Sequence, residues 1–365
     1  MKVEIGSDFW DYSIVNKECG KKFTEIENYK NKFLLNTGRN SIKLCIQQVE
    51  KKSKNVLLPS YTCDTVIKPF LEQKFNVHYY DLNLDLTINM NTLWEKTIEI
   101  NPDIVLFHGY FGFQTLINLE DYIKYAKEHD IKIIEDITHT LFSNIQRINS
   151  DFIVGSLRKW FAIPDGGVLL SHDKITTTKL EEDIETLDLM IRAFNIKKLY
   201  MNYRISDLKD LYLRLYRKAN ENLNSNVLYK MSDISQNIFR NCNIEDIKIK
   251  RKTNFRFLCE QLRGINGIEI IFDKCNECNT PLYFPIYIIE PEKRKKLQAY
   301  LAKNNIYCPI IWPKPKEFYE DNYVANYIYD HIICIPCDQR YNIDDMNKII
   351  LNIKLYFSRN YEDII

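Results

Sequence analysis

The chain has 365 residues, of which 45% are hydrophobic and 27% are charged, values typical of a globular enzyme with one large or two medium domains. Its 50 basic and 49 acidic residues leave a formal charge of +1, which offers no field to gather nucleic acid or anionic lipid. No window approaches the roughly 20 apolar residues of a membrane span, and residues 1–10 lack the apolar run of a secretory signal. We therefore expect a cytoplasmic enzyme with no nucleic-acid partner and no membrane span.

Ten cysteines are present, and two pairs have the C-x-x-C spacing that metal sites often use, Cys275/Cys278 and Cys334/Cys337. A zinc site of this kind has its two pairs roughly 15–20 residues apart. These pairs lie 59 residues apart, counted from Cys275 to Cys334. The second pair also lies in an apolar run, IICIP, where buried thiols are common. We predict reduced cysteines and no metal site.

From about residue 33 to residue 171, short apolar runs alternate with stretches of helical periodicity. The runs predicted to be strands are NVLLP (55–59), NVHYYDL (76–82), DIVLFHGY (103–110), IKIIED (131–136), DFIVG (151–155) and GVLLS (167–171). The helical stretches between them are 41–51, 64–73, 93–99 and 119–129. Continuous apolar strands separated by helices predict an α/β fold, with a mostly parallel sheet covered by helices on both faces.

The second half of the chain changes in style. Residues 176–224 are almost wholly helical in pattern, with apolar stripes typical of a core or a subunit interface. After about residue 250 an α+β pattern follows, with helix 251–263, strands 268–272 and 282–288, helix 292–304, strand 332–336 and helix 343–358. We predict a large domain, residues 1–250, that includes the helical insert at about 176–224, and a smaller C-terminal domain, residues 251–365.

Four polar side chains fall at predicted strand ends, namely His108, Asp136, His139 and Lys159. Ligands of parallel sheets bind outside the carboxyl ends of the strands. A lysine and a carboxylate on neighbouring strand ends are the groups that pyridoxal phosphate (PLP) chemistry needs. The lysine forms a Schiff base, and the carboxylate keeps the pyridine nitrogen protonated so that the ring accepts electrons. We predict that Lys159 and Asp136 are catalytic.

Short motifs follow one another in a fixed order along the chain. They are TGRNSI (37–42), LPSYT (58–62), YYDLNLDLTIN (79–89), HGYFG (108–112), EDITH (135–139), YKMS (229–232) and IP (335–336). Together they resemble the DegT-like family of sugar-nucleotide aminotransferases, which are PLP enzymes of fold type I, over nearly the whole chain. Lys159 lies eight residues before Gly167, the spacing of the family's Schiff-base lysine to its Gly-Gly pair, whereas Arg158 falls outside it.

The resemblance implies a PLP-dependent aminotransferase that moves an amino group from glutamate to a keto-sugar nucleotide. Its setting would be the synthesis of surface polysaccharide, lipopolysaccharide or antibiotic sugars, and its assembly a homodimer. Family members that act as sugar dehydratases carry histidine at the lysine position, so Lys159 argues against that branch. Two alternatives stay open: a PLP aminotransferase on a non-nucleotide keto compound, and a non-catalytic relative of the same fold.

The resemblance also implies which other residues contact the cofactor and the substrate. Besides Lys159 and Asp136, the residues expected at the cofactor are Gly38, Arg39, Cys63, His139 and Ser156. The residues expected at the substrate are His108, Tyr110 and Trp312. Gly38 and Arg39 begin a predicted helix, and the amides of a helix N-terminus can receive a phosphate.

Several positions depart from the family's pattern and predict a divergent member. Cys63 stands where the family carries an aromatic residue that stacks on the PLP ring, and Arg39 replaces a small hydroxyl residue near the phosphate. Ser156 lies three residues before the lysine rather than five, and Leu228 replaces an asparagine that reaches the other subunit's phosphate. We expect the pair Gly166–Gly167 to let strands approach and turn rather than to bind a ligand.

Overall fold

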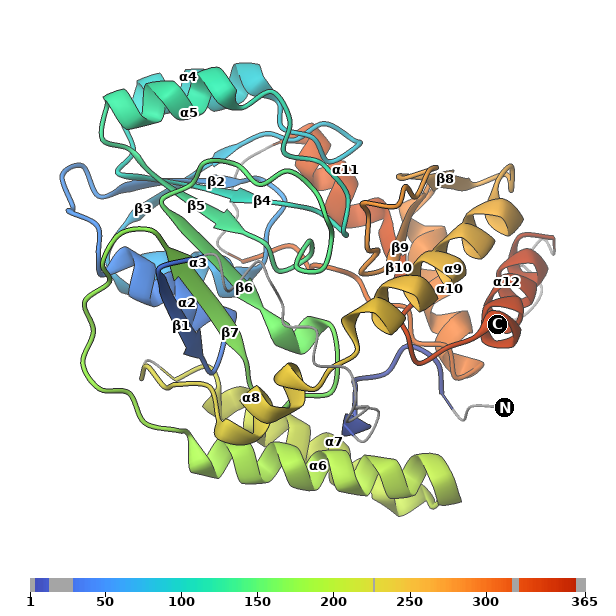
Figure 1. The fold of residues 1–365 in the computed structure, drawn as a ribbon. Coiled ribbons are helices and arrows are strands. Elements are labelled where there is room, and N and C mark those ends of the chain that lie inside the picture. Colours follow the sequence, from blue (N-terminus) through green and yellow to red (C-terminus); the bar gives the residue numbers. More distant parts are fainter. Residues whose placement is uncertain (1–3, 13–28, 226, 317–321, 359–365) are drawn as a thin grey trace.

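The computed structural model describes residues 4–12, 29–225, 227–316 and 322–358. A seven-stranded sheet with the order β1-β7-β6-β5-β4-β2-β3 lies at its centre (Figure 1). The strands are β1 (Asn31–Leu35), β2 (Asn55–Pro59), β3 (Asn76–Tyr80), β4 (Ile104–His108), β5 (Lys132–Asp136), β6 (Phe152–Ser156) and β7 (Gly167–Ser171). The neighbours from β3 to β6 pair in parallel, whereas β7 is antiparallel to β6 and to β1. The predicted α/β fold with a mixed, mostly parallel sheet is confirmed.

Helices cover both faces of this sheet. On one face lie α2 (Gly38–Ile46) and α3 (Asp64–Glu72), and on the other lie α4 (Met90–Ile100) and α5 (Glu120–Glu128). Because neither face meets water, the inner strands are apolar throughout, and every residue of β4 and of β7 is buried. Strand β1 was not predicted, since it is an edge strand with only one buried residue in its sequence NKFLL.

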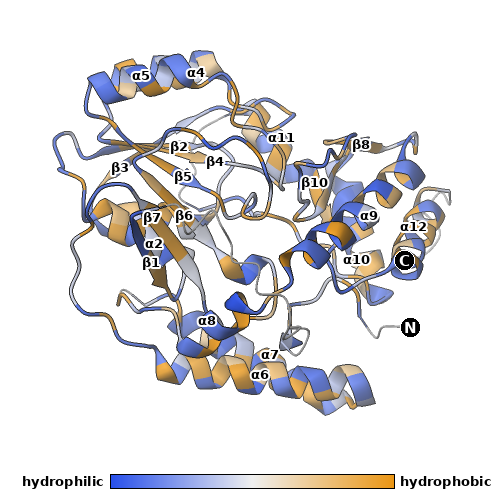
Figure 2. Ribbon diagram, in the orientation of Figure 1, coloured by the Kyte–Doolittle hydropathy of each residue, from blue (hydrophilic) through white to orange (hydrophobic). Residues whose placement is uncertain are grey.

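The predicted helical insert is a hairpin of two helices, α6 (Ile184–Tyr203) and α7 (Ser206–Asn222). Its helices begin eight residues later than predicted. The Asp183 side chain caps α6 by accepting a hydrogen bond from the Thr186 amide, and Gln48 holds Thr176 in an extended segment. The hairpin lies along the lower edge of the molecule in Figure 1, and Figure 2 shows apolar residues distributed along it. Those residues form a separate hydrophobic cluster that includes Phe194 and Tyr216.

The C-terminal part contains a small antiparallel sheet in the order β10-β9-β8, flanked by helices. Its elements are α8 (Asp233–Arg240), α9 (Ile244–Leu262), β8 (Ile268–Ile270), β9 (Phe284–Ile288), α10 (Pro291–Lys303), α11 (Tyr323–His331), β10 (Ile332–Ile335) and α12 (Ile343–Ser358). Helix α9 spans the boundary predicted at residue 250, and Ile5 pairs with Ile306 of the C-terminal part. The division into domains 1–250 and 251–365 stays a prediction.

Among the described helices, none combines the length and the apolar character that crossing a bilayer requires.

Candidate active site

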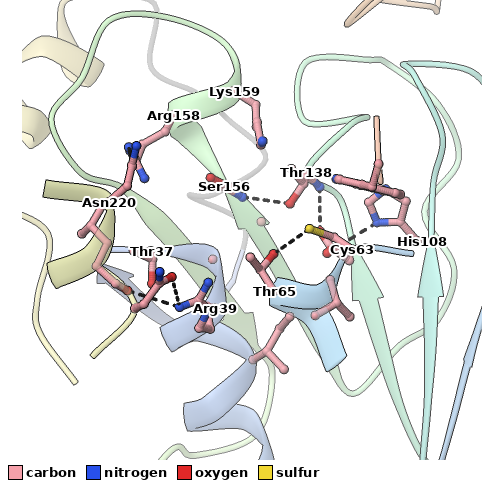
Figure 3. Close-up of a pocket in the computed structure, with 18 residues that line it drawn as sticks. Thr37, Arg39, Cys63, Thr65, His108, Thr138, Ser156, Arg158, Lys159 and Asn220 are labelled. Carbon is pink, nitrogen blue, oxygen red and sulfur yellow. Dashed lines mark hydrogen bonds and ion pairs between the residues drawn. The ribbon is translucent and has the colours of Figure 1, made fainter. Parts of the chain in front are cut away.

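The carboxyl ends of three neighbouring strands, β4, β5 and β6, open onto one cavity of about 300 Å³. The N-termini of α2 and α3 and the C-terminal end of α7 complete its wall, and Trp312 lines it from the C-terminal part (Figure 3). The predicted site residues that line it are Gly38, Arg39, Cys63, His108, Asp136, Ser156, Lys159 and Trp312. The structure therefore brings together eight of the ten residues that the sequence singled out.

Asp136 and His108 occupy the same register position on adjacent strands, at the ends of β5 and β4. Nδ1 of His108 lies 3.4 Å from Oδ2 of Asp136, and the Thr138 amide donates to Oδ1 at 2.9 Å. Burial works to raise the pKa of Asp136, but His108 and the hydrogen bonds from Thr138 outweigh it and hold the pKa below its usual value. The carboxylate is therefore ionised at neutral pH although it is buried.

Lys159 ends a short 3-10 turn, Leu157–Lys159, that follows β6 directly. Its side chain is exposed to the cavity, and Figure 3 shows the amine between Ser156 and Thr138. The next residue, Trp160, is fully buried and anchors the turn, because its indole N–H donates to the Thr138 carbonyl at 2.8 Å. The guanidinium of Arg251 packs over the Trp160 ring at 4.8 Å, which ties the turn to α9. The contacts of Trp160 thus fix the backbone position from which the Lys159 side chain extends.

The N-terminus of α2 meets the end of β6 at very short range. The Thr37 side chain caps the helix by accepting a hydrogen bond from the Asn40 amide at 3.1 Å. A Cβ at Gly38 would lie 3.2 Å from the Gly155 carbonyl oxygen, and a Cβ at Gly167 would lie 2.2 Å from the Thr37 backbone. Glycines therefore permit the approach, which at Gly167 is to the cap of a helix rather than to a strand as predicted. Gly38 and Arg39, in the first turn of α2, line the cavity together with Ser156, and the first turn of a helix has amides without partners in the helix.

Two arginines line the same end of the cavity. Arg39 donates from Nη1 to Oδ1 of Asn224 at 2.6 Å, and Arg158 donates from Nη2 to Oδ1 of Asn220 at 3.2 Å. Burial lowers the pKa of both guanidiniums, against the influence of nearby carboxylates, and an arginine remains charged at any physiological pH. Sequence reasoning missed Arg158 and both asparagines as site residues.

Cys63 caps the N-terminus of α3 without a side-chain bond to the helix, and its thiol faces the cavity. The Thr65 hydroxyl donates to Sγ at 3.1 Å. Burial raises the pKa of the Cys63 thiol, although the hydrogen bond from Thr65 and the charge of Lys159 oppose that rise. The thiol is therefore protonated at neutral pH, and it offers a small apolar surface rather than an aromatic ring.

The two remaining predicted residues, His139 and Tyr110, are not among those that line the cavity. His139 lies behind Trp312, with its ring stacked on the indole at 4.8 Å and an interplanar angle of 22°. Both ring nitrogens of His139 are buried without a hydrogen-bond partner, and burial lowers its pKa well below the usual value. Tyr110 turns back under α3 and donates its hydroxyl to the Tyr61 carbonyl at 2.6 Å. The lining of the cavity therefore does not support the predicted contacts of His139 with the cofactor and of Tyr110 with the substrate.

Thr138 is a further site residue that the sequence did not single out. Its amide binds Asp136, and its hydroxyl accepts a hydrogen bond from the Ser156 amide at 3.1 Å. Thr138 therefore joins the ends of β5 and β6. The sequence did offer a signal for Thr138, because it lies two residues after Asp136. A hydroxyl at that position can bond neighbouring backbone groups.

The lining residues fit PLP in three respects. Arg39, Arg158 and Lys159 bring positive charge, and the amides of α2 and the Ser156 hydroxyl add donors suited to a phosphate. Asp136 is the acidic residue of the described lining and lies at the opposite end, where a ring nitrogen needs a carboxylate. Trp312 supplies an aromatic wall beside Cys63, at the place where the sequence lacks the expected aromatic residue.

Comparison with known proteins was made at the level of family, sequence and structure. The sequence model of the DegT/DnrJ/EryC1/StrS aminotransferase family matches residues 16–354. Among curated proteins, a serine hydroxymethyltransferase from Methanothermobacter marburgensis is 28% identical over 109 residues, which cover 28% of this chain and 25% of that protein. The chain thus matches about a quarter of the length of that curated relative.

Solved structures share the fold at low identity. A putative sugar aminotransferase from Streptococcus pneumoniae in its PMP form has a TM-score of 0.68 and 14% identity, covering 97% of this chain and 92% of that chain. PseC from Helicobacter pylori, described as an aminotransferase of pseudoaminic acid biosynthesis, has a TM-score of 0.65 and 14% identity, covering 97% and 98%. DesV from S. venezuelae has a TM-score of 0.66 and 13% identity, covering 92% and 87%. These likenesses confirm the predicted fold type.

Proposed function

Because the chain belongs to the DegT/DnrJ/EryC1/StrS aminotransferase family, we propose that it transfers an amino group from glutamate to a keto-sugar nucleotide. Membership confirms the predicted enzyme class, an aminotransferase, and the predicted cofactor, PLP. The nucleotide-linked sugar, the donor and the roles of individual residues are the proposal. The observation that carries it is that Lys159 and Asp136 line one cavity, at the ends of adjacent strands.

The roles of the two residues follow from where they lie. Asp136 is held ionised by His108 and Thr138, so it would bind and keep the proton on the cofactor's ring nitrogen. The Lys159 amine, which reaches into the cavity from a turn fixed by Trp160, would bind the cofactor's aldehyde carbon. Once displaced by the amino donor, that amine is placed to take a proton from the substrate carbon and return it. When bound, PLP supplies the electron sink that makes this carbon acidic.

The other wall of the cavity supports a sugar as the acceptor. Trp312 and His108 present aromatic and polar surface that suits a sugar ring, which combines an apolar face with hydroxyl groups. One structural neighbour is described as a putative sugar aminotransferase and another as an aminotransferase of pseudoaminic acid biosynthesis, which supports a sugar acceptor. A homodimer and a cytoplasmic location are also part of the proposal.

The absorbance spectrum of the purified protein with PLP tests the proposal most directly. We expect the band of the lysine-bound cofactor, and we expect glutamate to convert it to the band of pyridoxamine phosphate. Adding a keto-sugar nucleotide should then restore the first band. Restoration by a free keto sugar alone would favour a non-nucleotide acceptor, and a spectrum without response to any amino donor would favour a non-catalytic relative.

Replacement of the lysine tests its covalent role. Lys159→Ala should lose the band of the lysine-bound cofactor and reduce transfer by about 10⁴-fold or more. It should still bind pyridoxamine phosphate, which needs no covalent link. Lys174→Ala, which removes an exposed lysine, is the matched control. Persistence of both the band and the transfer in Lys159→Ala would falsify the assignment.

A further inference from the structure

The α6–α7 hairpin reaches the cavity only at its C-terminal end, where Asn220, Leu223 and Asn224 line the wall. Building on the proposed function, we propose that Arg158 binds the cofactor's phosphate together with Arg39. We further propose that Asn220 and Asn224 are positioning residues that hold the two guanidiniums at that phosphate.

The first support is the geometry of the two arginines. They come from distant segments, Arg39 from the first turn of α2 and Arg158 from the turn after β6, yet both line the same cavity. Figure 3 shows them on the side away from His108 and Cys63, next to Thr37 and the hairpin. This is the end of the cavity at which the α2 amides and Ser156 lie, so all the phosphate donors converge there.

The second support is the state of their hydrogen-bonding groups. Within the described residues, the partners of both guanidiniums are neutral: the side-chain oxygens of Asn224 and Asn220 and the Leu223 carbonyl. Nε of Arg39 is buried without a partner. An arginine has five N–H donors, so among the described residues each guanidinium keeps donors without a protein partner. A partly buried guanidinium with unused donors in a cavity is suited to a phosphate, which accepts paired N–H bonds.

The third support is the charge of the site. The two arginines add positive charge to the helix N-terminus and the lysine, whereas Asp136 lies at the far end and is engaged by His108. Carboxylates act on the arginines through space: Asp64 and Glu72 on Arg39, and Asp165 and Asp8 on Arg158. Both oxygens of Asp165 are bonded to Ser232, so this carboxylate is already occupied. The uncompensated charge fits a phosphomonoester dianion.

The asparagines explain how the hairpin takes part. Asn220 lies in the last turn of α7 and Asn224 lies in the turn that follows the helix, and both are exposed residues that line the cavity. An amide oxygen orients an arginine without neutralising it, whereas a carboxylate in the same place would compete with the phosphate. The hairpin thus fixes the direction of both guanidiniums and leaves their charge available.

The test compares PLP with pyridoxal, which lacks the phosphate, by absorbance titration of Arg158→Met, Arg158→Lys and the double variant N220A/N224A. We expect Arg158→Met to weaken PLP binding by about 10–100-fold, the loss of a charged hydrogen bond, and to leave pyridoxal binding within about twofold. Arg158→Lys should restore part of the preference for PLP, because it keeps the charge and loses the planar fork. The double variant should weaken PLP binding by about 3–10-fold through the lost orientation of both arginines.

Arg192→Met is the matched control, since Arg192 lies on the exposed face of α6 and pairs with Asp188. Equal losses for PLP and pyridoxal in Arg158→Met, or an unchanged ratio of the two constants, would overturn the inference. If the wild-type protein binds neither ligand, the proposed function fails, and inorganic phosphate then tests the anion site alone. A rise in Tm with phosphate in the wild type but not in Arg158→Met supports the site, and no rise in either protein overturns it.

Discussion

The two ends of the cavity are built in different ways. At one end, which we call the ring end, Asp136 and His108 end neighbouring strands 3.4 Å apart, and the Thr138 amide donates to Asp136. At the other, the phosphate end of our proposal, Arg39 and Arg158 are bonded to asparagines at the end of the helical hairpin and just after it. Under the proposed function, the ring end would govern how charge moves during the reaction, and the phosphate end would govern how tightly the cofactor is held. We therefore expect changes at the ring end to lower kcat, and changes at the phosphate end to weaken PLP binding.

After Lys159→Ala, the largest effect should come from Asp136→Asn. The amide keeps the size of the side chain and an acceptor for the Thr138 amide, but it cannot hold the ring nitrogen cationic. We expect kcat to fall by about 10²–10⁴-fold while the Kd for PLP changes by less than about tenfold. Steady-state kinetics and absorbance titration measure the two constants. Asp130→Asn, at an exposed carboxylate, is the control, and near-normal kcat in Asp136→Asn would contradict the role of the ring end.

The opposite pattern is expected from Gly167→Ala. The new Cβ would meet the Thr37 backbone at 2.2 Å and push the N-terminus of α2 away from β7, which Gly167 begins, and from the neighbouring strand β6. We expect the free energy of unfolding to fall by about 1–3 kcal/mol and PLP affinity to fall with it. Urea denaturation and PLP titration measure both.

Gly264→Ala is the control that separates the clash at Thr37 from the general effect of replacing a glycine with alanine. Gly264 has open space around its Cβ position and a φ of +77°, so only backbone strain of about 1–2 kcal/mol is expected. PLP affinity should remain at the wild-type level in this variant. Equal losses of affinity in Gly167→Ala and Gly264→Ala would show that the approach of α2 to β6 does not shape the phosphate end.

The same contrast explains what the sequence could predict. The ring end is local: Asp136 and His108 each end an apolar strand, and parallel strands bring their carboxyl ends to one edge. The phosphate end depends on where the hairpin docks. Its apolar stripes indicated only a core or an interface, because helical periodicity gives the buried face of a helix and not the surface against which that face packs.

The sequence placed two residues at the cavity that do not line it, and the reason is related. His139 follows the strand end by three residues, and Tyr110 follows by two, so motif spacing placed both near the ligand. Beyond a strand end the chain direction is set by tertiary packing. Trp312, which comes from the C-terminal part, lies over His139, and Tyr110 packs under Tyr61. Edge strand β1 and helix α11 were missed because neither carries a strong periodic pattern of its own.

Replacing His108 should change the pH dependence of the ring end. His108 helps to hold the pKa of Asp136 below its usual value, against burial. A carboxylate with a depressed pKa stabilises the fold above its unfolded-state pKa of about 3.9, and that contribution is lost as pH falls through the lower folded-state pKa. Without His108 the folded-state pKa rises, so this contribution becomes smaller and its loss is complete at a higher pH.

His108→Phe should therefore move the acid limbs of unfolding and of kcat to higher pH, and lower kcat at neutral pH by about tenfold. Acid titration followed by circular dichroism and the pH profile of kcat measure the two limbs. His129→Phe, at an exposed histidine at the end of α5, is the control. Acid limbs that stay in place in His108→Phe would show that Thr138 and the backbone alone keep Asp136 ionised.

The smallest effect is expected at Trp312, which lies against His108 at the ring end. Its indole stacks on His139 and meets the His108 ring edge-on at 5.0 Å, so it is an aromatic wall rather than a charged contact. Trp312→Leu removes a stacking surface of about 0.5–1.5 kcal/mol, so KM for the sugar nucleotide should rise by about 2–10-fold with kcat almost unchanged.

Fluorescence locates that effect, because the chain has only four tryptophans. PLP should quench the emission of the wild type, and Trp312→Phe should lose most of that quenching while it keeps PLP affinity. Trp94 belongs to α4 and packs on Tyr122. The emission of Trp94→Phe should therefore be quenched by PLP as in the wild type. Full quenching in Trp312→Phe would instead place the ring nearer to Trp160 and would move the aromatic wall from the C-terminal part to the turn that carries Lys159.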